Sequence, residues 1–282
     1  MKIKLNGGSA EQHLISLNDM KKLSDSIQKI SYNYEYEKYG TRDKTIYIQA
    51  TKEGSFEILL GIIDSNHLSM IFDGVQGAFL YDIFTKMGKY LNSESSRKKI
   101  KKLLDETFDL ALELAEAEYF DVRFEKKKQT IEKNTKLINA ELSNYQAMKQ
   151  IASIVGESSN TDSLKPTSIQ FMATSYDNEI EELMINKETR ELLENNEVKA
   201  IKMENIVISG IPDTLSRSGK SFYMEVPFIG KVKIRASNSY LSAVSDYFKE
   251  TKSIKIEIEP IVRMGELTET RDAKLIKIIE EK

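Results

Sequence analysis

Two predicted strands near the C-terminus, 221–226 and 231–236, carry the residues whose types and spacing could bind a ligand. Successive side chains on a strand point to opposite faces, so alternate residues share a face. The face expected to point inward is apolar and consists of Phe222, Met224, Val226, Val232 and Ile234. The face expected to meet solvent consists of Tyr223, Glu225, Lys231, Lys233 and Arg235. Cations neutralise phosphates and a flat ring stacks on a base, so this face indicates a nucleic acid or nucleotide.

The loop before the first of these strands extends the same surface with two more cations. The candidate ligand-binding residues are therefore Tyr223, Lys231, Lys233, Arg235, Arg217 and Lys220. An ordinary structural role explains the pattern as well, because alternating cations keep a strand soluble and protect a sheet edge. Glu225 can also pair with a cation across the hairpin. The sequence leaves both interpretations open.

The order of the C-terminal elements predicts a small barrel that would position this face. We expect a first strand over 198–210, a loop over 211–220, the two strands above, and a short helix over 237–249. Strands over 252–264 and 271–279 follow. Three strands, a helix and two strands are the order of the OB-fold, in which strands two and three bind oligonucleotides. Other small barrels, or an open sheet with one helix, share this linear order. We predict an OB-like five-stranded barrel over 196–282.

The first 195 residues predict an α+β domain with a mixed sheet and a helical bundle. Short alternating segments predict strands over 1–5, 44–51, 55–63, 168–174 and 179–185. Apolar residues at helical spacing predict helices over 75–91, 97–119, 127–155 and 186–193. A further helix begins after Ser16, which serves as N-cap with Asp19 three residues on. The fold class is therefore α+β, with domains over 1–195 and 196–282.

Two features of the first domain indicate a protein-interaction or oligomerisation module instead. The predicted helix 127–155 is long and polar, and its thin apolar stripe suggests packing against a partner chain or a second copy. The segment 32–39 contains four tyrosines, and tyrosine is enriched at interfaces. This alternative is a regulator, inhibitor or sensor in phage–host conflict, with a homo-oligomer formed through the central helices.

Composition argues against most kinds of catalysis. The chain has no cysteine and only two histidines, so thiolate chemistry is excluded and histidine chemistry is limited. No P-loop and no Gly-x-Ser-x-Gly motif is present. Asp64, His67 and Asp73 are a weak set for a metal-dependent hydrolase, since their spacing matches no ligand pattern. We therefore assign no catalytic residue, metal or cofactor and favour a binding protein over an enzyme.

Charge and hydropathy limit the partners and the compartment. The 282 residues include 41 basic and 44 acidic ones, a net charge of −3, so no overall field attracts nucleic acid. From Glu197 onward the net charge is +2, which leaves −5 on the preceding residues. No apolar run approaches the roughly 20 residues that a membrane span requires. The first residues lack the apolar core of a signal peptide. We expect a cytoplasmic protein of a bacterial or phage setting with no membrane partner.

Short motifs resemble those of an uncharacterised bacterial two-domain family. The matching pieces are Leu5-Asn6-Gly7-Gly8, Glu53-Gly54-Ser55-Phe56-Glu57-Ile58, Ile206–Gly210 and Asn238-Ser239-Tyr240. The resemblance implies an N-terminal strand region, a helical middle and a C-terminal small β-barrel. It also implies an association with mobile elements and antiviral defence loci, but it transfers no activity and no site residue.

Overall fold

The computed structural model describes residues 1–12, 14–49, 57–64, 75–91, 93–115, 122–156, 165–198, 200–216, 218–263 and 271–279. Its contacts group the chain into two compact units. Unit 1 comprises Met1–Ser96 and Ala140–Val198, and unit 2 comprises Arg97–Asn139 and Lys199–Lys282. The domain boundary between residues 195 and 196 stays a prediction, and the grouping places residues 97–139 with the barrel. The α+β fold class is confirmed.

Unit 1 is built on a five-stranded sheet. Its strands are β1 (Lys2–Asn6), β2 (Lys44–Gln49), β3 (Glu57–Asp64), β4 (Ser168–Thr174) and β5 (Ile180–Ile185). They lie in the order β2-β3-β1-β4-β5, and all four pairings are antiparallel. The sheet is therefore antiparallel, whereas the sequence predicts a mixed one. For β2–β3 and β4–β5 the antiparallel direction follows from the connections, because these strands are neighbours in the chain as well as in the sheet.

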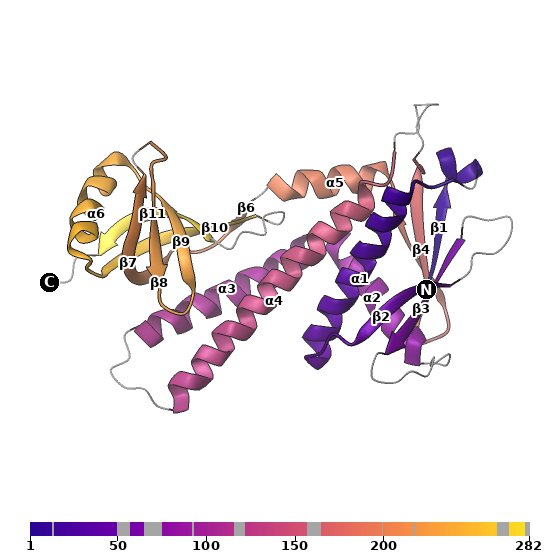
Figure 1. Ribbon diagram of the computed structural model, residues 1–282, viewed down its shortest axis with the longest axis horizontal. Coiled ribbons are helices and arrows are strands. Elements are labelled where there is room, and N and C mark those ends of the chain that lie inside the picture. The colour runs from indigo at the N-terminus through magenta and orange to yellow at the C-terminus, as the bar shows by residue number, and fades with distance from the viewer. Residues whose placement is uncertain are drawn as a thin grey trace. The chain divides into compact units, whose positions relative to one another are not determined.

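Helices α1 (Leu17–Tyr39) and α2 (Val75–Leu91) lie against one face of this sheet (Figure 1). The predicted start of α1 is confirmed, since the Ser16 hydroxyl accepts a hydrogen bond from the Asp19 amide at 3.0 Å. The helix ends at Gly40, whose φ of 76° places it in the left-handed region that glycine adopts readily. Unit 1 also contains the 3-10 helix η1 (Gly8–Gln12) and α5 (Lys187–Val198).

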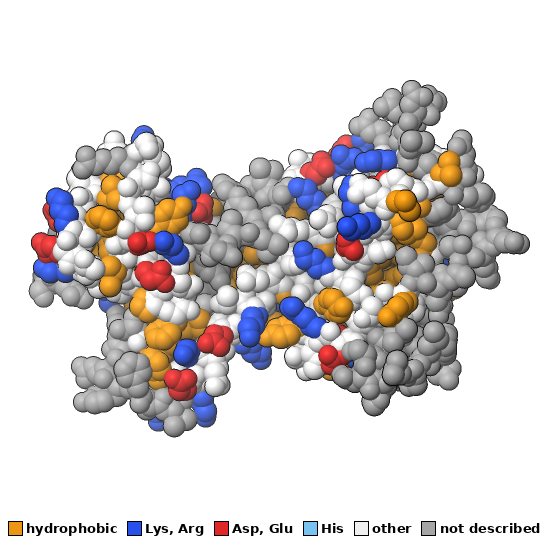
Figure 2. All heavy atoms as spheres, in the orientation of Figure 1, with side chains coloured by type: hydrophobic (Ala, Val, Ile, Leu, Met, Phe, Trp, Pro, Cys, Tyr) orange, Lys and Arg blue, Asp and Glu red, His pale blue; other side chains and the backbone are white. Residues whose placement is uncertain are grey.

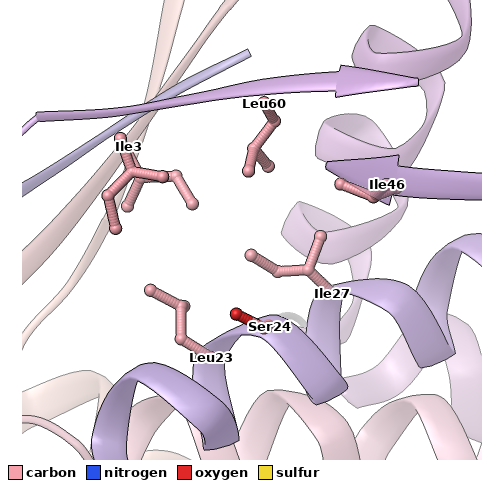
Figure 3. A pocket seen from close by; sticks show the side chains of 7 residues that line it. Ile3, Leu23, Ser24, Ile27, Ile46 and Leu60 are labelled. Carbon is pink, nitrogen blue, oxygen red and sulfur yellow. The ribbon is translucent and has the colours of Figure 1, made fainter. Parts of the chain in front are cut away.

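A small gap remains in the core between α1 and the sheet (Figure 3). It is lined by Ile3, Leu23, Ser24, Ile27, Ile46, Ile58 and Leu60. Its volume of about 20 Å³ has room for about one water molecule. The one polar side chain, Ser24, already donates its hydroxyl hydrogen to the Met20 carbonyl at 3.0 Å. The gap is therefore a packing defect and not a ligand site.

Two long helices, α3 (Ser93–Ala115) and α4 (Val122–Ala152), form the helical middle. The second half of α4 belongs to unit 1. It is buried on nearly all sides, whereas the sequence suggested a polar helix with only a thin apolar stripe. Every residue from Ala140 to Met148 is buried except Gln146, including the polar Glu141 and Asn144. These polar side chains made the helix look solvent-exposed in the sequence, but they form hydrogen bonds inside unit 1.

Unit 2 contains the predicted OB-like barrel. Its strands are β7 (Ile206–Ser216), β8 (Ser221–Val226), β9 (Gly230–Arg235), β10 (Ile254–Arg263) and β11 (Arg271–Ile279). The strands pair in the order β9-β8-β7-β10-β11, and β11 closes the barrel by pairing with β9 in parallel. Helix α6 (Asn238–Glu250) joins the third strand to the fourth, as in the OB-fold, and buries Leu241 and Val244.

The first barrel strand differs from its prediction. Helix α5 continues to Val198, a short strand β6 (Ala200–Lys202) pairs with β10, and β7 begins only at Ile206. The segment predicted as a loop after Gly210 is largely strand, because β7 continues to Ser216 through an irregularity between Pro212 and Thr214. The sequence suggested a loop because proline usually argues against a strand. A proline is tolerated at a bulge, which is where Pro212 lies.

The turn between β8 and β9 packs against the end of α3 and the first half of α4, which belong to the same unit. Phe228 in the turn meets Phe124 of α4 edge to face, with 5.4 Å between ring centroids. Ile229 lies against the cluster formed by Ala111, Leu114, Phe124 and Ile131. This apolar contact joins the barrel to the helical hairpin within unit 2.

Candidate nucleic-acid interface

The predicted alternation of inward and outward side chains in β8 and β9 is confirmed. Phe222, Met224, Val226, Val232 and Ile234 are buried inside the barrel. Across the two strands Tyr223 pairs with Lys233, Glu225 pairs with Lys231, and Ser221 pairs with Arg235. Tyr223, Lys231, Lys233 and Arg235 therefore lie on one outer face of the barrel, which we call the β8–β9 face.

Lys231 is the most constrained cation of this face. Its ammonium forms an ion pair with Asp213, and it lies 5.6 Å from the centroid of the Tyr223 ring. The hydrogen bond between the two charged groups raises the pKa of Lys231 and lowers the pKa of Asp213. Asp213 stands in the bulge of β7, and a bulge redirects a side chain that would otherwise follow the alternation.

Arg235 is also paired with an acid. Its Nη2 lies 2.8 Å from Oδ2 of Asp272 on β11. Because β11 runs parallel to β9, Asp272 lies beside Lys233, and the next outward residue of β11, Lys274, lies beside Arg235. Lys274 is exposed and adds a fourth cation to this part of the barrel.

The loop residues of the predicted site have different outcomes. Lys220 is exposed, with a φ of 46°, and directly precedes the pair of Ser221 and Arg235. It therefore lies at the end of the face that carries Arg235. Arg217 lies outside the described residues.

Three residues of this surface were missed by the sequence analysis. The alternation in 271–279 places Ala273 and Leu275 inside, so it could have placed Asp272 and Lys274 outside. Asp213 gave no such signal, because its position depends on the bulge. The acids change the character of the face: Figure 2 shows acidic side chains beside basic ones on the visible side of the barrel.

The two units differ more in net charge than the segments before and after Glu197 do. Unit 2 has 26 basic and 21 acidic residues, a net charge of +5, whereas unit 1 has 15 and 23, a net charge of −8. The difference arises because residues 97–139, which are net basic, belong to the barrel's unit. A polyanion is therefore attracted to unit 2 and repelled by unit 1.

The other sites considered in the sequence find no support in the described residues. Asp64 ends β3, and His67 and Asp73 lie outside the described part of the chain. Among the residues that the structure describes, no three His, Cys, Asp or Glu side chains are grouped as a metal site would need. Within the same residues no helix has the length and apolar character to cross a membrane.

The four tyrosines of 32–39 lie at the end of α1, and Tyr34 and Tyr39 are in contact with charged groups. Tyr34 donates its hydroxyl hydrogen to Asp82 of α2, and Lys38 binds both of them. Tyr176, from the β4–β5 turn, donates to the same carboxylate at 2.8 Å. Burial pushes the pKa of Asp82 upward, but these hydrogen bonds outweigh it and lower the pKa. Tyr39 is half exposed beneath the ammonium groups of Lys38 and Lys44.

These features define an α+β protein with an OB-like barrel, one face of which carries basic side chains paired with acidic ones. No protein family model, no curated protein and no solved structure matches the chain.

Proposed function

We propose that this protein is a non-enzymatic binding protein whose β8–β9 face engages nucleic acid. The observation that carries the proposal is the common position of Tyr223, Lys231, Lys233 and Arg235 on the strands that OB-folds use for oligonucleotides. The net charge of +5 on unit 2 supports the same ligand, because it attracts phosphates over a distance. A cytoplasmic location and membership of the bacterial two-domain family are parts of this proposal.

The acid pairs determine which kind of contact this face favours. The ring of Tyr223 already lies beneath Lys231, so a base would have to displace that ammonium before it could stack. Phosphate groups can instead compete with Asp213 and Asp272 for the cations that these carboxylates now hold. We therefore expect contacts to the phosphate backbone, a modest affinity and a strong dependence on salt.

Fluorescence anisotropy with labelled single-stranded and duplex oligonucleotides over a salt series tests the proposal. The double variant Lys231→Glu/Lys233→Glu reverses two cations of the face. We expect it to weaken binding about tenfold and to lower the slope of log affinity against log salt by about 2. The matched control is Lys21→Glu/Lys89→Glu, which changes the charge equally at two exposed sites of unit 1. Affinity and slope unchanged in the barrel variant would show that the proposal is wrong.

The tyrosine surface of unit 1 favours protein interaction as a second candidate function. Tyr176 is 64% exposed and its ring meets Tyr81 edge-on, so a large aromatic area faces solvent in a fixed orientation. Aromatic surfaces of this kind are common in interfaces. Light scattering tests the oligomeric form of this candidate: a monomer at micromolar concentration counts against a homo-oligomer.

A further inference from the structure

A second cationic surface lies on the first half of α4, in the same unit as the barrel. Between residues 122 and 139 this helix carries six basic and two acidic residues. Lys126, Lys133 and Lys136 are exposed and occupy neighbouring positions on one helix face, because seven and three residues correspond to about two turns and one turn. We call these three residues the α4 stripe. It spans about 15 Å along the helix.

The lysines of the stripe differ from the cations of the β8–β9 face in their ion pairs. Lys231 and Arg235 are held by acids of the barrel, and Lys127 of α4 is held by Glu113 at 2.6 Å. For the three lysines of the stripe, by contrast, the described residues contain no ion-pair partner. Glu125 and Glu132 border the stripe on one side but leave its net charge positive. Free ammonium groups can bind phosphates without first breaking an internal pair.

The aromatic contact between Phe124 and Phe228 relates the two cationic surfaces. Phe124 comes two residues before Lys126 in α4, and Phe228 comes three residues before Lys231. The contact therefore places the first turns of α4 near the beginning of β9, but Lys126 follows Phe124 by about 200° around the helix, so the stripe lies on the side of α4 away from Phe228. A polyanion that contacts both surfaces must therefore be long enough to extend past the helix.

The ligand chemistry follows from what the two surfaces lack. Proteins that bind single strands stack bases on aromatic side chains. The exposed residues of α4 between 123 and 139 include no aromatic side chain, and Tyr223 on the barrel is covered by Lys231. Cations without free aromatic rings match a duplex, whose bases are already stacked and whose phosphates carry one charge per about 1.7 Å. A duplex is also long enough to contact two separate surfaces.

We propose that the α4 stripe binds the phosphate backbone of a nucleic-acid duplex together with the β8–β9 face, an inference that rests on the proposed function. A membrane surface is the other polyanion that a cationic helix can bind. Helices that do so insert an apolar face between the lipids. In α4 the apolar side chains Phe124, Ile131 and Ile138 are buried in the protein, so the observations favour the duplex.

Anisotropy with a labelled DNA duplex of about 20 base pairs, and with one of its strands alone, tests the inference in the full chain. We expect the wild type to bind the duplex more tightly than the strand. The variant Lys126→Glu/Lys133→Glu should bind the duplex about tenfold more weakly, with a salt slope lower by about 2. The control Lys21→Glu/Lys89→Glu should bind as the wild type does. Circular dichroism melting of each variant establishes that it is folded.

The variants separate this inference from the proposed function. If the α4 variant binds like the wild type while Lys231→Glu/Lys233→Glu binds more weakly, the stripe is not a binding surface and the barrel face remains one. If the wild type prefers the single strand, the duplex is the wrong ligand. If the α4 variant loses only binding to phosphatidylserine vesicles, the partner is a membrane and the inference is overturned. Absence of any oligonucleotide binding overturns both proposals.

Discussion

Phe124 and Phe228 meet edge to face, with an angle of 78° between their ring planes. Phe228 makes this contact from an unusual backbone conformation, with a φ of 65°. The turn is closed by the hydrogen bond from the Ile229 amide to the Val226 carbonyl at 3.2 Å, with Pro227 second and Phe228 third. Turns with a positive φ at the third position normally have glycine there, since a side chain is strained. We expect the packing against α4 to compensate this strain.

Substitutions at Phe228 should therefore separate packing from backbone strain. We expect Phe228→Ala to reduce the free energy of unfolding by about 1–2 kcal/mol, because the aromatic contact is lost and the strain remains. Phe228→Gly should cost about 1 kcal/mol less, since glycine adopts the left-handed conformation freely. Urea unfolding measures both values.

Phe248→Ala is the matched control for this pair of substitutions. Phe248 is 41% exposed and Phe228 is 38% exposed, so both lose a similar apolar area. An equal loss for Phe248→Ala and Phe228→Ala would show that the contact with Phe124 contributes nothing specific. Equal stabilities of Phe228→Ala and Phe228→Gly would show that the positive φ carries no cost.

The barrel shows how much of such a fold its sequence predicts. The inward residues of β8 and β9 follow from alternation alone, because a strand with one buried face must alternate. The pairs Lys231–Asp213 and Arg235–Asp272 do not follow from it. One depends on a bulge, and the other on a parallel pairing between strands separated by helix α6 and strand β10. The cations of the candidate site were predictable, whereas the acids that hold them were not.

The second half of α4 shows where the hydropathy pattern fails. Polar residues such as Glu141 and Asn144 look solvent-exposed in a sequence, because polar groups are usually at the surface. Here both are buried, since side chains from α1 and α2 satisfy their hydrogen bonds. Periodicity cannot recognise a polar network whose members come from three helices. The expectation of a partner chain on this helix rested on that pattern.

Side chains of α1 form hydrogen bonds with the backbone at the start of β2, an arrangement that we call the clamp. It predicts a large loss of stability when Glu35 is replaced. Its buried carboxylate accepts backbone hydrogen bonds from Asp43 and Lys44 at 3.1 and 3.0 Å. Two turns earlier on α1, Gln28 accepts a hydrogen bond from the Ile46 amide and donates one to the Lys44 carbonyl. The helix thereby occupies backbone groups of β2 that would otherwise remain free at the sheet edge.

We expect Glu35→Ala to lower the free energy of unfolding by about 3 kcal/mol, because it leaves buried donors without an acceptor. Glu35→Gln should cost less, since the amide oxygen still accepts one hydrogen bond. Asp25→Ala, at an exposed position of the same helix, is the control and should change stability by less than about 0.5 kcal/mol. A Glu35→Ala protein as stable as the control would mean that the clamp is unimportant.

Asp82 predicts a pH dependence of stability in unit 1. Its pKa is lowered in the folded protein by hydrogen bonds from Tyr34, Lys38 and Tyr176. A carboxyl group with a lowered folded pKa binds protons more readily in the unfolded chain, so folding is favoured above the unfolded value of about 4. This contribution should disappear as the pH falls below 4 and through the folded pKa.

Asp82→Asn tests the pH dependence directly. At neutral pH we expect the variant to be less stable than the wild type by about 1 kcal/mol, since the site is partly exposed. The difference between the two proteins should shrink steadily below about pH 4. Unfolding in urea at several pH values measures this difference. A difference that is constant with pH would show that the charge of Asp82 has no part in the stability.

The buried polar network of unit 1 gives the last prediction. Tyr90 donates its hydroxyl hydrogen to Glu141 at 2.8 Å and accepts a hydrogen bond from Asn144 at 2.8 Å. Asn144 in turn accepts one from Asn33 of α1 at 2.7 Å, so the network joins α1, α2 and α4. Burial raises the pKa of Tyr90 well above its usual value, and the nearby Glu141 raises it further. The hydroxyl is therefore a permanent donor at neutral pH.

Tyr90→Phe removes this hydroxyl without changing the shape of the core. We expect a loss of about 2 kcal/mol in the free energy of unfolding, because Glu141 and Asn144 each lose a partner while buried. Combining it with Asn144→Ala in a double-mutant cycle should give a loss smaller than the sum of the two single losses, since the residues share one hydrogen bond. Additive losses would show that the two residues act independently and that their shared hydrogen bond contributes nothing.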